Sequence, residues 1–182
     1  MRLDHIAYRV KDREKTTAFF IECFGYRIPD DLPDGFTIEF EDGTKAKCYA
    51  LVPPEKIITS APWNHLHPLN DGSVNYHLAP EIFVSEGTPG SIVESWVNAR
   101  NGVGGIHHLA YQVDSVQDKM NEWREKGYAE FTTEDPLTCP GLVQAFTQPS
   151  EITGVIYEFI EREGHGFCEA NVKDLMKSTK DL

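Results

Sequence analysis

The sequence predicts an α+β fold in which two βαβββ modules form one open, barrel-like sheet, followed by a C-terminal helix. The first observation is a weak internal repeat: LDHIAYRV at 3–10 matches IHHLAYQV at 106–113, and His5 aligns with His108. The second is that a helical pattern follows each copy and ends at a Gly-Tyr pair, a common helix stop. The third is a series of short β-type segments after each helix. The two halves are therefore expected to be copies of one supersecondary unit.

The β-type segments after the first helix are separated by turn signals. FEDGTK contains an Asp-Gly pair, which favours a hairpin. The expected strands of the first half, after the repeat segment, are 36–40, 46–52 and 81–85, and those of the second half are 142–146 and 154–161.

Four helices are expected, at 12–24, 89–100, 115–126 and 169–179. Together they divide the chain into a first module (1–88), a bridging helix with a Gly-rich turn (89–105), a second module (106–163) and a C-terminal lid helix (164–182). The lid is expected because Gly164 and Gly166 form a plausible hinge before Phe167. The stretch 53–80 carries no helix or strand pattern and is expected to be an ordered loop.

Charge and composition exclude several classes of partner. The net charge is -12, which disfavours nucleic acid and anionic membranes, because both attract clustered Lys and Arg. No apolar run approaches the roughly 20 residues that a spanning helix needs. The four cysteines are scattered, so reduced thiols in a cytoplasmic protein are expected. An anionic small molecule stays compatible with the acidic chain if a metal supplies local positive charge.

Three strands each offer one side chain that can bind a metal: His5, His108 and Glu158. In each strand, alternation places that side chain on one face, as His5 lies with Ala7 and Arg9. Two imidazoles and one carboxylate suit a divalent ion with open positions, whereas a closed structural zinc site usually has a fourth ligand.

Each of these residues also has a structural alternative. The histidines could be hydrogen-bonded core residues, Glu158 could pair with Arg162, and His107 competes with His108. A separate cluster could form from the loop histidines His65, His67 and His77.

The later half of the chain resembles a known family, the vicinal oxygen chelate (glyoxalase/bleomycin resistance/dioxygenase) superfamily. It is most similar to the catalytic half of 4-hydroxyphenylpyruvate dioxygenase. The similarity rests on GSIVESWVNARNGVGGIHHLAYQV, LVQAFTQPSEITGVIYEFIER and GHGFCEANVKDL.

The resemblance implies that His108 and Glu158 bind iron together with His5. It also implies that Gln144 and Phe146 face the substrate, and that Phe167 lies on a mobile C-terminal gate. The chain departs from the family pattern at Ser85 and His107, which fall on substrate-contacting positions.

The function that these residues predict is an Fe(II)-dependent oxygenase that acts on an anionic 2-oxo acid. Zn, Ni, Co or Mn are the alternative metals. The second reading is a redox-neutral lyase, isomerase or epimerase of the glyoxalase type, in which Glu81 or Glu86 could be the base. The third is a non-catalytic protein that binds a small ligand. A homodimer is left open.

Overall fold

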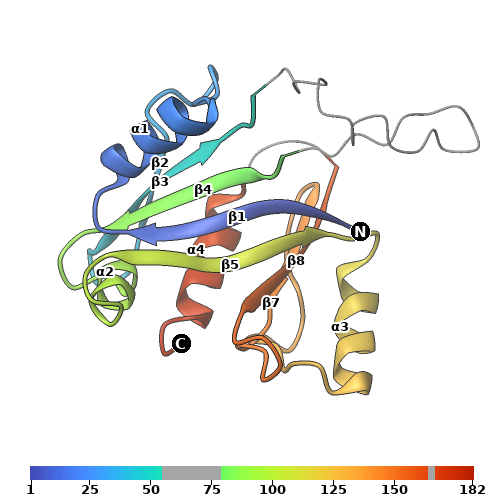
Figure 1. The fold of residues 1–182 in the computed structure, drawn as a ribbon. Coiled ribbons are helices and arrows are strands. Elements are labelled where there is room, and N and C mark those ends of the chain that lie inside the picture. The colour runs from blue at the N-terminus through green and yellow to red at the C-terminus, as the bar shows by residue number, and fades with distance from the viewer. Residues whose placement is uncertain (55–78, 164–166) are drawn as a thin grey trace, which may run out of the picture.

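The computed structural model describes residues 1–54, 79–163 and 167–182 (Figure 1). The expectations for His65, His67, His77 and the hinge glycines Gly164 and Gly166 lie outside these residues.

Eight strands form one sheet in the order β2-β3-β4-β1-β5-β8-β7-β6. The first module contributes β1 (Arg2–Val10), β2 (Phe36–Glu39), β3 (Lys45–Leu51) and β4 (Glu81–Gly87). The second contributes β5 (Gly104–Gln112), β6 (Leu137–Cys139), β7 (Leu142–Phe146) and β8 (Ile156–Arg162). The two βαβββ modules are thus confirmed, and β6 is the one strand that the sequence pattern does not predict.

The two modules are related by an internal symmetry that the strand pairing makes visible. β1 pairs in parallel with β4, and β5 pairs in parallel with β8. β1 and β5 then pair antiparallel with each other and join the modules into one curved sheet (Figure 1). The repeat segments found in the sequence therefore lie side by side at the centre of the molecule.

The first helix of each module packs on the outer face of the sheet. α1 (Arg13–Phe24) starts at Asp12, whose side chain accepts from Lys15 N, and α3 (Val116–Lys126) starts at Ser115 in the same way. Both helices end at a glycine in the left-handed region, which confirms the expected stops. Beneath them lie two apolar clusters, which include Phe20 with Val84 and Met120 with Phe159.

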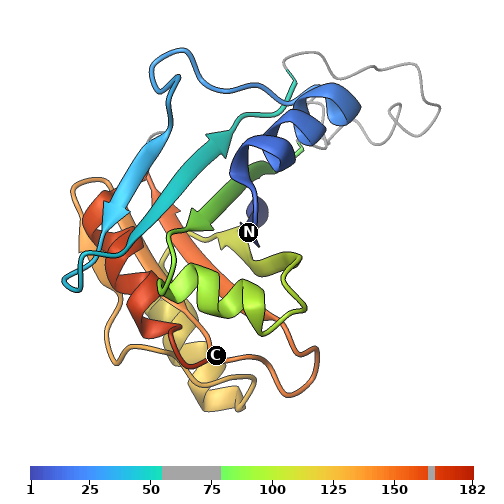
Figure 2. The same cartoon turned by 90° about the vertical axis from the view of Figure 1, so that its left-hand side faces the viewer.

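The bridging helix and the C-terminal helix lie on the inner face. α2 (Ile92–Asn98) begins after Ser91, whose hydroxyl accepts from Glu94 N. α4 (Glu169–Ser178) lies in the hollow of the curved sheet, on the side opposite α1 (Figure 2). Its residues Val172 and Met176 pack with Phe83 in the inner cluster. This arrangement covers the concave face, where the candidate ligands point.

The central strand pair depends on one glycine. Gly104 has φ +86°, and a Cβ atom there would lie 2.0 Å from the backbone oxygen of Arg9. A larger residue would push β5 away from β1, so the Gly-rich turn before the second repeat has a steric origin.

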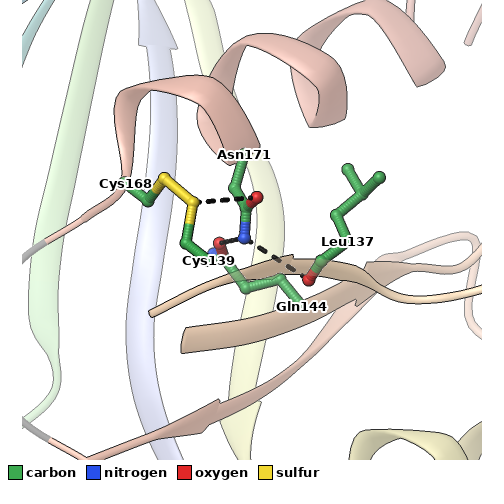
Figure 3. Close-up of a disulfide and its surroundings, with 5 residues drawn as sticks. All are labelled: Leu137, Cys139, Gln144, Cys168 and Asn171. Carbon is green, nitrogen blue, oxygen red and sulfur yellow. Dashed lines mark hydrogen bonds between the residues drawn. A yellow bond between two sulfur atoms is a disulfide. The ribbon is translucent and has the colours of Figure 1, made fainter. Parts of the chain in front are cut away.

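Two of the four cysteines form a disulfide, so the expectation of four reduced thiols is wrong. Cys139 at the end of β6 is bonded to Cys168 just before α4 (Figure 3), while Cys23 and Cys48 are free. The bond ties the C-terminal helix to the second module.

None of the helices in the described ranges has the length and hydropathy that crossing a membrane requires.

Candidate metal centre

The three predicted ligands come together on the concave face. His5 on β1, His108 on β5 and Glu158 on β8 belong to neighbouring strands, and all three side chains are buried. His5 Nε2 lies 3.2 Å from His108 Nε2. Glu158 Oε2 lies 3.1 Å from His5 Nε2 and 3.0 Å from His108 Nε2.

These spacings fit a divalent metal ion. Bonds of about 2.1 Å at right angles require donor atoms about 3.0 Å apart, which is the spacing of three ligands on one face of an octahedron. In the described residues no fourth His, Cys, Asp or Glu joins the group. A metal ion held by these three residues would therefore have further coordination positions available for a substrate.

A second layer of contacts orients His5. Its Nδ1 lies 2.8 Å from Asp4 Oδ1, so Nδ1–H donates to Asp4 and Nε2 is directed at the metal position. Arg162 Nη2 donates to the same carboxylate at 2.6 Å. Arg162 thus pairs with Asp4 rather than with Glu158, which removes one structural alternative for the glutamate.

The protonation of the triad without metal follows from its charges. Burial opposes the charge on His5, but Glu158 and Asp4 outweigh it and raise the pKa of His5 to about 9. Burial also favours the protonated form of Glu158, yet His5 and His108 hold the pKa of Glu158 well below its usual value. Burial lowers the pKa of His108, against the pull of Glu158. Without a metal, these shifts favour a protonated His5 beside an ionised Glu158.

The neighbouring histidine, His107, contacts His108 and is not part of the candidate triad. His107 Nδ1 lies 2.8 Å from His108 Nδ1. When His108 binds a metal through Nε2, its Nδ1–H donates to His107, whose own proton is then on Nε2. His107 Nε2 is buried and has no hydrogen-bond partner. The geometry therefore favours His108 over His107 as the candidate ligand, in agreement with the repeat alignment.

Gln144 is connected to the metal centre through Glu158. Its Nε2 donates to Glu158 Oε1 at 2.6 Å, and its Oε1 accepts from Asn171 Nδ2 at 3.2 Å. Asn171 lies on α4, next to the disulfide between Cys139 and Cys168 (Figure 3). The chain of contacts therefore runs from the C-terminal helix to a candidate ligand, and sequence alone does not reveal Asn171.

The triad opens into a cavity with mostly apolar walls. The predicted substrate residues Ser85, His107, Gln144, Phe146 and Phe167 all line it. The Phe146 ring lies 4.5 Å from the His108 ring, and the Phe167 ring lies 5.2 Å from the His5 ring. From α4, the lining residues are Val172, Leu175 and Met176. That α4 moves as a lid stays a prediction, as do the substrate roles of these residues.

Two further features differ from what the sequence suggests. Glu81 and Glu86 do not line the cavity; Glu86 accepts from Arg13 N, and Glu81 lies 3.9 Å from Arg162. Arg9, by contrast, does line it and is only 3% exposed. Its position on the His5 face of β1 was the available signal, because strand alternation puts both side chains on one side.

Comparisons with known proteins find epimerases among the proteins of similar sequence. An ethylmalonyl-CoA/methylmalonyl-CoA epimerase of Cereibacter sphaeroides is 27% identical over 161 residues, which cover 86% of this chain and 95% of that protein. A mitochondrial methylmalonyl-CoA epimerase of Bos taurus is 23% identical over 160 residues, covering 86% of this chain and 72% of that protein.

Solved structures share the fold. A methylmalonyl-CoA epimerase superposes with a TM-score of 0.62 at 22% identity, covering 90% of this chain and 97% of that one. A mutant of 4-hydroxymandelate synthase from Streptomyces coelicolor superposes with a TM-score of 0.70 at 18% identity, covering 98% of this chain and 53% of that one.

The expectation of an Fe(II)-dependent oxygenase, an oxidoreductase acting on a 2-oxo acid, is therefore wrong. The relatives found by sequence are epimerases, and epimerases also recur among the similar structures, which favours the redox-neutral alternative.

A family model independently matches residues 4–138, from the first metal-ligand strand to β6. The chain belongs to the glyoxalase/bleomycin resistance protein/dioxygenase superfamily.

Proposed function

We propose that this protein is a metal-dependent, redox-neutral enzyme that epimerises or isomerises a small carbonyl compound by moving a proton next to the carbonyl. The observation that carries the proposal is the buried triad of His5, His108 and Glu158, whose donor atoms lie 3.0 to 3.2 Å apart at a cavity wall. The similarity to ethylmalonyl-CoA and methylmalonyl-CoA epimerases supports a substrate with a carboxylate beside an acyl carbonyl.

The chain's own residues would hold and orient such a substrate. A bound divalent ion supplies Lewis acidity, which polarises a carbonyl oxygen and makes the neighbouring C–H more acidic. Phe146 and Phe167 lie against the two ligand histidines and exclude water from the reacting carbon. Among the described lining residues, Glu158 is the single carboxylate, so the negative charge of the substrate meets little repulsion there.

Exchange of a substrate proton with solvent tests this proposal directly. The metal-free protein is loaded with Co(II), Mn(II), Zn(II) or Ni(II) and incubated under nitrogen in D2O with methylmalonyl-CoA or ethylmalonyl-CoA. Mass spectrometry should then show one deuterium at the carbon between the two carbonyl groups, together with inversion of its configuration.

Two variants serve as controls. His108→Ala should lose both the metal and the exchange, whereas Cys23→Ser, at an exposed free cysteine on α1, should keep both. A metal-loaded protein that binds these thioesters but exchanges no proton would favour the non-catalytic reading and overturn the proposal.

A further inference from the structure

Arg9 is a buried cation for which the described residues provide no anion. Its side chain is on the concave face of β1, and the residue is 3% exposed. Nη2 donates to Thr179 Oγ1 at 2.9 Å, but Nη1 has no hydrogen-bond partner among the described residues. No carboxylate forms an ion pair with Arg9 in the described part of the chain, although Asp4, Glu81 and other acidic residues pair elsewhere.

The environment of Arg9 makes its positive charge energetically unfavourable. Burial and the nearby guanidinium of Arg100 lower the pKa of Arg9 to about 9, so the group is still a cation at neutral pH. A buried charge without a counterion is unfavourable, because it has lost its hydration. The face of Trp96, 5.8 Å away, offers only a weak cation–π contact. The contact with Thr179 fixes one nitrogen and leaves the charge uncompensated.

Two other buried donors without partners lie in the same region. Trp96 Nε1 on α2 and His107 Nε2 on β5 both lack hydrogen-bond partners, and the rings of these residues are 5.4 Å apart. Three side chains from three different elements thus lie near one another, and each has a polar nitrogen without a partner among the described residues. Such a cluster of donors is complementary to a group rich in acceptors, above all a planar carboxylate.

Arg9 and His107 line the cavity of the metal centre, and Trp96 lies beside them. Arg9 and His5 lie on one face of β1 four residues apart, which corresponds to about 13 Å between their Cα atoms. Apolar side chains, including Ala7, Phe83 and Met176, line the cavity with them. A molecule that binds the metal position can therefore extend toward Arg9 through an apolar section.

We propose that Arg9, with Trp96 and His107 beside it, binds a carboxylate of the substrate at the end of the cavity distant from the metal. This inference deepens the proposed function and rests on it for the reacting carbonyl, which would lie at the triad. The substrate class is then an acyl compound whose carboxylate lies at Arg9 while its carbonyl lies at the triad. Arg9 would be a specificity residue that selects this anion.

Binding of simple dicarboxylates tests the inference without turnover. Isothermal titration calorimetry measures the binding of succinate and glutarate to the full chain loaded with Zn(II) and again in EDTA. The expected result is binding by the wild type and at least about tenfold weaker binding by Arg9→Met, since charge-assisted hydrogen bonds are lost. Arg2→Met, which removes an exposed arginine from the same strand, should bind as the wild type does.

Thermal unfolding of the ligand-free proteins separates this role from a structural one. Arg9→Met should unfold at the same temperature as the wild type or higher, because an uncompensated buried charge has been removed. A lower unfolding temperature with unchanged dicarboxylate binding would overturn the proposal, as would a wild type that binds neither probe. If Arg9→Met does not fold, Trp96→Phe provides the test, since it removes one donor and keeps the ring; unchanged binding by this variant would also overturn the proposal.

The two proposals can fail independently. Dicarboxylate binding that depends on Arg9, without proton exchange in any thioester, would reject the proposed function and keep the Arg9 site. Proton exchange that is unaffected by Arg9→Met would keep the proposed function and reject the Arg9 site.

Discussion

At the scale of single residues, Gln144 illustrates how one side chain can serve a metal centre without touching the metal position. Both ends of its amide are occupied by protein, with Glu158 accepting on one side and Asn171 donating on the other. Gln144 also lines the cavity, so the predicted contact with substrate and the support of Glu158 are compatible. The geometry indicates that Gln144 also positions Glu158, a role that the resemblance to the family does not imply.

Replacing Gln144 should therefore weaken metal binding. Gln144→Ala leaves Glu158 Oε1 without its donor, and losing such a supporting contact typically costs about 10 to 100-fold in metal affinity. Competition with a chelator measures the affinity for Zn(II). Thr138→Ala, an exposed substitution on neighbouring β6, is the control. Unchanged zinc affinity in Gln144→Ala would show that Glu158 needs no support.

Metal binding should also release a proton. Since Glu158 and Asp4 raise the pKa of His5 to about 9 against the effect of burial, His5 is protonated in the metal-free protein at pH 7. A metal takes the place of that proton, so affinity should rise with pH up to about 9 and level off above it.

The same shift affects stability without metal. The stabilisation that charged His5 contributes is complete below its unfolded pKa of about 6.5 and is lost as pH rises through about 9.

The release of a proton on metal binding can be measured by calorimetry in buffers of different ionisation enthalpy, which should find about one proton released per zinc at pH 7. A release near zero would mean that His5 is already neutral.

The sequence supplies the ligands but not their surroundings. His5 and His108 could be predicted because the repeat aligns them, and Glu158 because it interrupts an apolar strand. Strand alternation places Arg9 on the face of His5, but Trp96 and Asn171 could not be assigned, because their contacts join elements far apart in sequence.

At the scale of elements, local signals predict the helices well and the shortest strand poorly. The capping residues Asp12 and Ser115 and the glycine stops define α1 and α3 to within one residue. β6 has three residues, too few to show an alternating pattern. The disulfide was missed because Cys139 and Cys168 are 29 residues apart and become neighbours only through the position of α4.

The disulfide should contribute measurably to the stability of α4. Closing a loop of 29 residues is worth about 3.6 kcal/mol in the chain-entropy model, so Cys139→Ser with Cys168→Ser should unfold at lower urea concentration. Loosening the start of α4 should also speed cleavage by trypsin at Lys173 and Lys177. Cys23→Ser serves as the matched control, because that thiol is free and exposed. Equal cleavage rates in both proteins would mean that the apolar contacts of α4 hold it without the bond.

At the scale of the whole molecule, the two modules are similar in fold but unequal in chemistry. β1 pairs Ala7 with Phe83, and β5 pairs the equivalent Ala110 with Glu158. Phe83 thus occupies in the first module the position that the carboxylate ligand occupies in the second. The candidate centre receives one histidine from each module and a carboxylate from only one, so an aromatic ring stands on the first-module side where the second module has a ligand.

A metal bound there should stabilise both modules together. Because His5 belongs to the first module and His108 and Glu158 to the second, the ion links the two halves across the central strand pair. A ligand that binds only the folded state at 100 times its dissociation constant adds about 2.7 kcal/mol. Zn(II) should therefore raise the urea midpoint relative to EDTA while leaving the urea dependence of the unfolding free energy unchanged. His5→Ala and Glu158→Ala, one from each module, should both lose this stabilisation. If His5→Ala gained as much from zinc as the wild type does, the metal would be held by the second module alone.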